Sequence, residues 1–185
     1  KGVASTVVHR LADRGLIDYF APVARYWPEF AAAGKEHVTV ADVLTHRAGL
    51  HRVRNLRPGR MGIVDYDATV RALAAAPPDS RRLSGPGYHA VTYGWLVAEI
   101  VQRVTGLPFV DVVRQEIAEP LGTPEFWFRV PEDQRHRIAK LFPRINPAGL
   151  HWGMTASVLS RVSLTRGLAE AAMPEEFDEL VRDPS

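Results

Sequence analysis

The stretch Pro86-Gly87-Tyr88-His89-Ala90-Val91-Thr92-Tyr93-Gly94 joins a Pro-Gly turn to the start of an apolar segment with helical periodicity. Apolar residues recur at helical spacing as far as Thr105, and Gly106 then provides a stop for the helix. This arrangement places the phenol of Tyr88 at a junction between a loop and a helix, where a side chain can be aimed at a site. Taken alone, the same tyrosine could also be a turn residue whose hydroxyl is satisfied by the backbone.

Helical patterns with local start and stop signals occur on both sides of this stretch. They predict helices from Gly2 to Arg14 with a stop at Gly15, from the capping box Thr39-Val40-Ala41-Asp42 to about His46 with an end at Gly49, and from a cap at Asp65 or Asp67 through Ala76. Further helices are predicted from Pro108 to about Ala118 and over residues 131–140, 155–163, 166–172 and 175–182, whereas Phe126–Phe128 is either a short strand or an aromatic plug. No internal repeat and no series of alternating strands is visible, so the chain is predicted to be mainly α.

The composition is that of an ordinary globular domain. The 185 residues are enough for one domain with a real core, and 46% hydrophobic with 24% charged residues is typical of soluble proteins. No apolar run approaches the roughly 20 residues that span a bilayer. The net charge of +2 is weak evidence for an acidic partner, and the absence of cysteine excludes a thiolate nucleophile and a Cys-ligated metal.

Metal and nucleic-acid sites have little support in the sequence. His46 and His51 lie on either side of Gly49, which is poor spacing for a pair of ligands, and no carboxylate cluster accompanies them. The arginine-rich run 52–60 lacks interleaved aromatic residues, so a solvated loop is favoured over a nucleic-acid interface. Neither a metal, a cofactor nor a nucleic-acid partner is therefore predicted. The four tryptophans are interpreted as packing residues, although Trp127 could also line an acyl-binding wall.

The nucleophile of a hydrolase is hard to find in this chain. Gly-x-Ser-x-Gly does not occur, so the elbow of an α/β-hydrolase has no support. No serine stands three residues before Lys35 or Lys140, which leaves Lys1 as the only lysine that could belong to a Ser-x-x-Lys motif, with its serine just before the chain begins. Residues three apart share a helix face, so such an amine can accept the hydroxyl proton. Without that serine, Lys1 is simply an exposed terminal residue.

An ordered series of segments resembles the serine β-lactamase and penicillin-binding-protein-like family, and more narrowly the esterase branch of its class C-like group. One of these segments, Val43–Leu50, is similar to the family's LLTHTSGL stretch. The others are residues 1–5, 11–18, 22–23, 27–30, 38–40, 86–90, 93–109 and 119–122. The resemblance covers Lys1 to about Gly122 and is thin after Arg144. It implies one partial domain over residues 1–185, starting at the Lys of Ser-x-x-Lys. That domain would be the helical portion of the family's α+β fold, with most sheet strands missing from this chain.

The resemblance also implies a reaction. The family's serine attacks an ester or amide carbonyl to form an acyl-enzyme, and Lys1 and Tyr88 would share the proton transfers as base and acid. A phenol ionises only near pH ~10 unless a cation lies beside it, and Lys1 would be that cation. The implied substrates are small esters with short acyl or lipid-like groups. The chain as given, which lacks the nucleophile, is expected to be inactive.

His89 and Ala90 occupy the implied substrate-binding positions. Ala90 stands where β-lactamases carry an Asn, so the resemblance favours an esterase over efficient β-lactam hydrolysis, and His89 is expected to point to solvent. A D-Ala peptidase, a weak β-lactamase and a non-catalytic acyl-, peptide- or partner-binding member remain alternatives. The family's third motif would lie beyond Ser185, since His151-Trp152-Gly153 matches it by coincidence. Cell location, whether cytoplasmic or cell-envelope associated, stays open.

Overall fold

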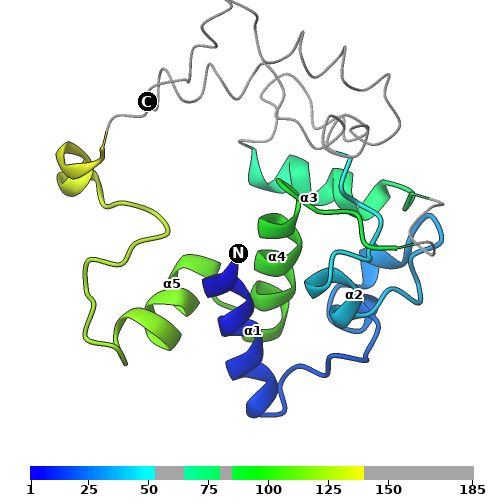
Figure 1. Ribbon diagram of the computed structural model, residues 1–185, viewed down its shortest axis with the longest axis horizontal. Helices are drawn as coiled ribbons and strands as arrows, with labels where there is room; N and C mark the ends of the chain where they lie inside the picture. The colour runs from blue at the N-terminus through cyan, green and yellow to red at the C-terminus, as the bar shows by residue number, and fades with distance from the viewer. Residues whose placement is uncertain (53–64, 80–84, 140–185) are drawn as a thin grey trace, which may run out of the picture.

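In the computed structural model, residues 1–52, 65–79 and 85–139 are described, and their regular structure is helical (Figure 1). The α-helices are α1 (Gly2–Asp13), α2 (Val40–Leu44), α3 (Tyr66–Ala75), α4 (Tyr93–Thr105) and α5 (Phe109–Val113). Short 3₁₀ segments are η1 (Val23–Arg25), η2 (Pro28–Ala31) and η7 (Glu132–Arg137), and a π-helical segment, η6 (Arg114–Ala118), continues α5. Within these residues the only β pairing is an isolated antiparallel bridge between Pro22 and Thr39.

Helix α4 is the central element, because α1, α2, α3 and α5 all pack against it. In Figure 1 it lies between α1 and α3. Its predicted apolar stripe is buried, with Leu96 and Ile100 almost completely removed from solvent. The stripe belongs to one core with Val7 and Leu11 of α1 and Leu73 of α3. Since each such side chain stabilises the fold by about 1.5–3 kcal/mol when buried, this core fixes α1 and the start of α4 relative to each other.

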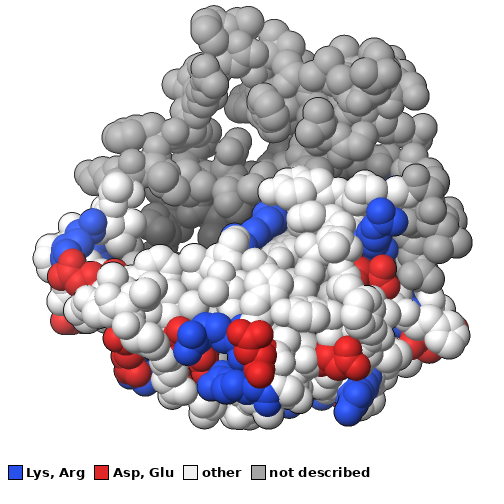
Figure 2. Space-filling view, turned by 60° about the horizontal axis from the view of Figure 1, so that its bottom comes forward, with Lys and Arg blue, Asp and Glu red and all other residues white. Residues whose placement is uncertain are grey.

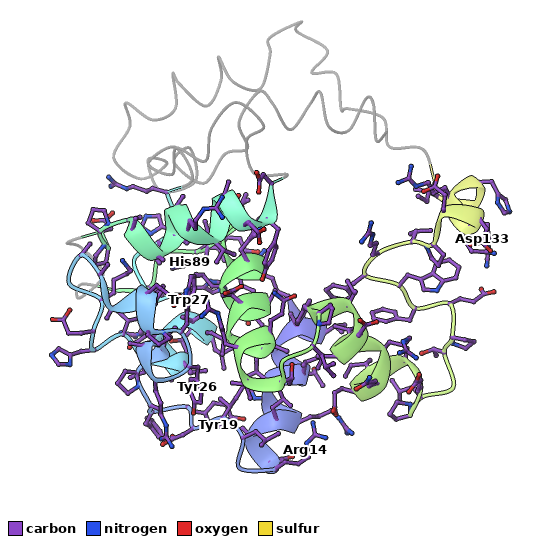
Figure 3. All side chains as sticks on the ribbon, turned by 180° about the vertical axis from the view of Figure 1, so that it is seen from behind. Arg14, Tyr19, Tyr26, Trp27, His89 and Asp133 are labelled. Atoms are coloured by element: carbon purple, nitrogen blue, oxygen red, sulfur yellow. The ribbon has the colours of Figure 1, made fainter. Side chains whose placement is uncertain are left out.

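The core continues into the segment between η1 and η2. Trp27 lies entirely inside the molecule, as Figure 3 shows, and its ring centroid is 5.0 Å from that of Phe30. Its predicted packing role is therefore confirmed. Nearby, the backbone N–H of Asp18 donates to the Tyr26 hydroxyl at 2.8 Å, which ties the preceding loop to this segment.

Glycine ends the two longest helices as predicted. Helix α1 is followed by Gly15, whose φ of 72° is left-handed, and α4 by Gly106, whose φ is 71°. A residue without Cβ adopts this conformation at little cost, so the sequence signal is local and reliable. The cap of α3 is also confirmed, because the Asp65 side chain accepts a hydrogen bond from the backbone of Ala68 at 2.9 Å.

Helix α2 starts as predicted but ends earlier. Thr39 and Asp42 form the expected capping box, in which each side chain accepts a hydrogen bond from the other's backbone N–H. The helix stops at Leu44 and not at about His46 as predicted. His46 itself has a φ of 63°, so the chain leaves the helix through a left-handed residue three positions before Gly49.

The predictions for the C-terminal part need more correction. The helix expected from Pro108 to Ala118 is α for its first half and π for its second. The helix expected over 131–140 is a 3₁₀ segment, η7, and Phe126–Phe128 is not a strand. The helices predicted over 155–163, 166–172 and 175–182 lie outside the described residues, as does most of the arginine-rich run.

The expectation of a mainly helical chain is confirmed for the part of the chain that the structure describes. Whether sheet strands are missing from the chain stays a prediction. Among the described helices, none combines the length and the apolar character that crossing a bilayer requires.

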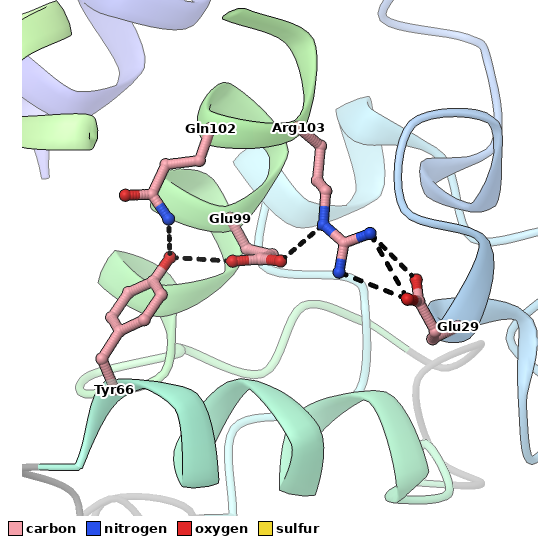
Figure 4. A network of polar contacts seen from close by, with 5 residues as sticks. All are labelled: Glu29, Tyr66, Glu99, Gln102 and Arg103. Carbon is pink, nitrogen blue, oxygen red and sulfur yellow. Dashed lines mark hydrogen bonds and ion pairs between the residues drawn. The ribbon is translucent and has the colours of Figure 1, made fainter. Parts of the chain in front are cut away.

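A buried polar network links the second half of α4 to its neighbours (Figure 4). The Tyr66 hydroxyl of α3 donates to Glu99 at 3.0 Å, and Gln102 donates to the same hydroxyl at 2.9 Å. Arg103 donates to Glu99 at 2.8 Å and also pairs with Glu29 of η2 at 3.2 Å. The Glu99 side chain is only 8% exposed, so its charge depends on these partners.

Lys35 is a second buried charge with a structural role. Its ammonium donates to the backbone carbonyls of Ala32 (2.6 Å), Ala74 (2.9 Å) and Ala76 (2.5 Å), the last two at the C-terminal end of α3. Burial lowers the pKa of Lys35 to about 8. A cation at this end of a helix complements the free carbonyls and the helix dipole.

The surface carries both signs of charge. Figure 2 shows one face, on which positive and negative side chains lie next to each other. Arg10 and Arg14 of α1, for example, both pair with Glu116 of η6, at 2.9 and 2.5 Å. These pairs fasten α1 to the α5–η6 segment.

Candidate active site

Lys1 lies at the N-terminus of α1, beside the loop that leads into α4. Its backbone carbonyl accepts the hydrogen bond from Ser5 N–H (2.9 Å) that opens the helix. Its side chain reaches across to this loop, where Nζ donates to the carbonyl oxygen of Ala90 at 2.6 Å. The first residue of the chain is thus held against the Tyr88 segment because α1 and α4 pack together.

Tyr88 lies next to Lys1, as the predicted pairing requires. The Lys1 ammonium is 5.0 Å from the centroid of the Tyr88 ring. The tyrosine side chain is 56% exposed, so a substrate could reach its hydroxyl. The turn is closed by a hydrogen bond from the backbone N–H of Ala90 to the carbonyl oxygen of Tyr88 at 3.0 Å.

A second tyrosine, Tyr93, also approaches Lys1, with its ring centroid 6.0 Å from the ammonium. This side chain is only 3% exposed. Burial raises the pKa of Tyr93, and a hydrogen bond with the Ser5 side chain lowers it in part. Of the two phenols beside the lysine, Tyr88 is therefore the accessible one and Tyr93 belongs to the core.

His89 does not point to solvent as predicted, because its side chain is completely buried (Figure 3). The backbone N–H of Leu50 donates to Nε2 at 3.0 Å, so the ring proton lies on Nδ1 and is donated to the carbonyl of Gly87 at 2.6 Å. Burial lowers the pKa of His89 to about 4, with smaller contributions from His46 and His51. The ring is thus a neutral support beneath the Tyr88 turn. Contact between His89 and a substrate stays a prediction.

Ala90 contributes its backbone to the site. Its carbonyl holds the Lys1 ammonium, and its half-buried side chain has no polar group. The lysine is therefore oriented without the side-chain amide that the resemblance places at this position in β-lactamases. Contact between Ala90 and a substrate also stays a prediction.

His46 reaches this site from the loop after α2. Its ring centroid lies 4.8 Å from that of Tyr88, 5.1 Å from Tyr93 and 5.5 Å from His89. Its carbonyl accepts from Gly87 N–H at 2.9 Å, and its Nδ1 accepts from His89 N–H at 3.2 Å. Burial lowers the pKa of His46, and the charge of Lys1 lowers it further.

The same loop brings His51 against the turn. A Cβ placed on Gly87 would lie 2.6 Å from Nδ1 of His51, so only glycine fits beside this ring. The centroids of His51 and His89 are 5.9 Å apart. Although three histidines gather here, no group of three or more metal-ligating side chains in the described residues is placed to hold a metal ion.

Comparison with known proteins fits this geometry. A family model described as "Beta-lactamase" matches residues 1–182. The chain belongs to the β-lactamase family. The resemblance inferred from the ordered segments is therefore confirmed.

Individual relatives match about three quarters of the chain. The "Esterase/beta-lactamase LipL" of Mycobacterium tuberculosis (strain ATCC 25618 / H37Rv) is 46% identical over 142 residues, which are 76% of this chain and 32% of that protein. The "Esterase EstB" of Burkholderia gladioli is 32% identical over 154 residues, 75% of this chain and 39% of that protein. The crystal structure of a family VIII carboxylesterase superposes with a TM-score of 0.69 at 40% identity, covering 77% of this chain and 39% of that one.

The chain spans between 32% and 39% of the length of these relatives. The candidate site described above is built by α1, the loop after α2 and the entrance of α4.

Two residues of this part of the site were missed by sequence reasoning. Tyr93 was treated only as part of the helix, and His46 was placed in the stretch that resembles LLTHTSGL and at the end of a helix but was given no role in the site. A signal for His46 does exist, because it follows the short helix at a position where a stop residue such as glycine is expected. Nothing in the sequence alone indicates which way its ring turns.

Proposed function

We propose that this chain supplies the lysine and the tyrosine of a serine esterase that works through an acyl-enzyme. The proposal rests on the contact between Lys1 and Tyr88, whose ammonium and ring lie 5.0 Å apart although one residue begins α1 and the other precedes α4. The fold thus joins a cation and an accessible phenol at one point. Such a pair can accept and return a proton during acyl transfer.

The nucleophile would be a serine three residues before Lys1 in the full-length protein. On a continued α1 helix this serine would share the face of Lys1, within reach of its amine. Its hydroxyl oxygen attacks the ester carbonyl carbon while its proton passes to the Lys1–Tyr88 pair. The tetrahedral intermediate then collapses to the acyl-serine and expels the alcohol, which takes the proton from the pair.

Deacylation repeats these steps with water. A water molecule attacks the carbonyl carbon of the acyl-serine and loses a proton to the same pair. The second tetrahedral intermediate releases the carboxylic acid, and the serine oxygen recovers its proton. Lys1, held by the carbonyl of Ala90, keeps the pair in place through both halves of the reaction.

Esters are the preferred substrate class in this proposal. Ala90 offers no side-chain amide at the position where the resemblance places the Asn of β-lactamases, so one donor toward a lactam side chain is lacking. The names of two relatives, an esterase and a carboxylesterase, support the same choice, whereas the third is named for both esterase and β-lactamase activity. Short acyl or lipid-like groups are the proposed acyl part.

The test is hydrolysis of p-nitrophenyl esters of increasing acyl length by the full-length protein. Tyr88→Phe is expected to lower kcat by about 10²–10⁴-fold, because it removes one partner of the proton transfer. Tyr93→Phe is the matched control, since it removes the other phenol beside Lys1, and its kcat should stay close to wild type. Wild-type kcat in Tyr88→Phe would contradict the proposal.

The identity of the upstream residue separates the enzyme from a binding protein. A serine three residues before Lys1 together with ester hydrolysis supports the esterase. Another residue there, with no hydrolysis, would make the protein a non-catalytic member that binds an acyl group, peptide or partner. Residues 1–185 alone are expected to release no p-nitrophenol above background.

A further inference from the structure

Among the α-helices in the described part of the chain, three are followed by a left-handed residue, and one of these three residues is not glycine. Ala33 (φ 58°) is also left-handed, but it follows the 3₁₀ segment η2. After α1 the residue is Gly15 (φ 72°), after α4 it is Gly106 (φ 71°), and after α2 it is His46 (φ 63°). A left-handed conformation brings Cβ of an L-residue close to its own backbone, which is why glycine is favoured at such positions.

The ends of α1 and α2 are built by the same hydrogen bonds. At α1, Gly15 N–H donates to Ala12 and Leu16 N–H to Leu11, at 2.8 and 3.0 Å. This paired pattern is the Schellman motif.

At α2 the corresponding donors are His46 N–H to Val43 and Arg47 N–H to Asp42, at 3.2 and 2.6 Å. The motif is identical, so the backbone of α2 gives no reason for a histidine in place of glycine. The reason must lie in what the side chain does.

The side chain and carbonyl of His46 hold the residues on both sides of Tyr88. The carbonyl accepts from Gly87 N–H at 2.9 Å, and Nδ1 accepts from His89 N–H at 3.2 Å. Between these two anchors the imidazole meets the Tyr88 ring in an edge contact, with centroids 4.8 Å apart and planes at 62°. A glycine at this position would keep the first anchor and lose the other two contacts.

We propose that His46 is a positioning residue that fixes the Tyr88 phenol beside the Lys1 ammonium. This inference rests on the proposed function for its catalytic meaning, but its geometry does not. The groups that face the imidazole are Lys1, Tyr88, Tyr93 and His89. Because Nδ1 accepts a hydrogen bond, the ring proton lies on Nε2 and the ring is neutral.

The kinetic test compares His46→Gly with His46→Asn in full-length protein. His46→Gly should lower kcat on p-nitrophenyl esters about ten- to a hundredfold with little change in KM, because a displaced phenol weakens the proton transfer. Asparagine tolerates the left-handed conformation and carries an oxygen near the place of Nδ1. His46→Asn should therefore recover most of the lost kcat.

Gly15→His is the matched control for the backbone. It puts a histidine into the same motif at the end of α1, where a Cβ would meet nothing within 4 Å. Its melting temperature should fall while its kcat stays at the wild-type value. A His46→Gly variant that keeps wild-type kcat would overturn the positioning role, as would a His46→Asn variant no better than His46→Gly.

Amide hydrogen exchange tests the same inference without catalysis. In His46→Gly, the His89 amide should exchange about five- to tenfold faster, since it loses its acceptor, whereas the Gly87 amide should keep its protection. Unchanged exchange at His89 would overturn the inference. If the wild-type protein hydrolyses no ester, the proposed function fails, and the exchange result alone then decides the positioning of Tyr88.

Discussion

Helix α4 carries two polar regions that differ in charge and in exposure. At its N-terminal end, the exposed Lys1 and Tyr88 are supported by neutral rings and backbone groups. In its second half, the buried Glu99 is paired with the Tyr66 hydroxyl of α3 and with Arg103 of its own helix, and Arg103 in turn pairs with Glu29 of η2 (Figure 4). The titratable side chains of Lys1 and Tyr88, at the N-terminal end of α4, are therefore accessible to solvent, whereas Glu99 in its second half is buried.

The network around Glu99 has the features of a structural site. Burial and the charge of Glu99 both raise the pKa of Tyr66, so this hydroxyl remains a donor. Arg103 lies between Glu99 and Glu29, and its pKa is raised chiefly by its hydrogen bond to Glu99. Groups that satisfy one another in this way stabilise the packing of three elements but have no proton to offer a substrate.

The region around Lys1 and Tyr88 contains a strained backbone residue and a buried polar ring, and both support side chains that remain accessible to a substrate. His46 holds a left-handed conformation, and His89 is buried without charge beneath the turn. Strained and partly exposed sites of this kind contribute less to the free energy of unfolding, and they are typical of catalytic sites. The two ends of α4 should therefore respond to mutation in opposite ways, one in activity and the other in stability.

The largest expected effect is on activity, at Lys1. Lys1→Met in the full-length protein should lower kcat by about 10³-fold or more, because it removes a partner of the proton transfer. Its melting temperature should barely change, since the side chain is exposed. Ester hydrolysis and thermal unfolding measured on one preparation check both statements. A large loss of stability with unchanged kcat would reverse the assignment of the two regions.

Glu99→Ala should show the opposite behaviour. It leaves the Tyr66 hydroxyl without its acceptor and Arg103 without its inner partner, so the free energy of unfolding should fall by about 2–4 kcal/mol. Below the unfolding transition, kcat should stay close to wild type. Denaturant unfolding provides the measurement, and Glu125→Ala, which breaks an exposed pair with Arg137, is the control expected to change little. An equal effect in both variants would mean that the buried network is no stronger than a surface pair.

The third effect, which is confined to acidic pH, is the pH dependence of stability caused by His89. The pKa of His89 is lowered from 6.5 in the unfolded chain to about 4 in the folded protein. As the pH falls, the unfolded chain therefore binds a proton on His89 before the folded protein does. The free energy of unfolding is therefore unaffected by this titration above pH 6.5, and it decreases by about 3 kcal/mol as the pH falls from 6.5 to 4.

His89→Gln isolates this contribution. It keeps an acceptor for the Leu50 amide but does not titrate. The difference in unfolding free energy between wild type and His89→Gln should therefore shrink or change sign between pH 6.5 and 4. Parallel pH profiles for the two proteins would show that His89 does not titrate on unfolding.

Local chemistry made the helix ends predictable. The capping box of Thr39 and Asp42 and the stops at Gly15 and Gly106 depend on residues close in sequence, so the pattern alone was sufficient. The early end of α2 was missed because the left-handed residue there is a histidine, His46, which propensity does not favour. The π form of η6 was missed because no stop residue separates it from α5, and the 3₁₀ form of η7 was missed because a proline such as Pro131 precedes α-helices as well.

The site was predictable only through the order of the family's segments. The pairing of Lys1 with Tyr88 needs the packing of α1 against α4, which no local pattern encodes. The burial of His89 was mispredicted because its partner, the amide of Leu50, comes from the loop after α2. Loop residues follow no period, so their burial depends on such distant partners.

The central claim is that Lys1 and Tyr88 serve a serine acyl-enzyme, and covalent labelling of the full-length protein tests it most directly. An activated phosphonate ester should modify the residue three positions before Lys1, as located by peptide mass spectrometry, and labelling should be much slower in Lys1→Met and Tyr88→Phe than in Tyr93→Phe. Labelling of another residue such as Ser5, or equal rates in all variants, would contradict the account.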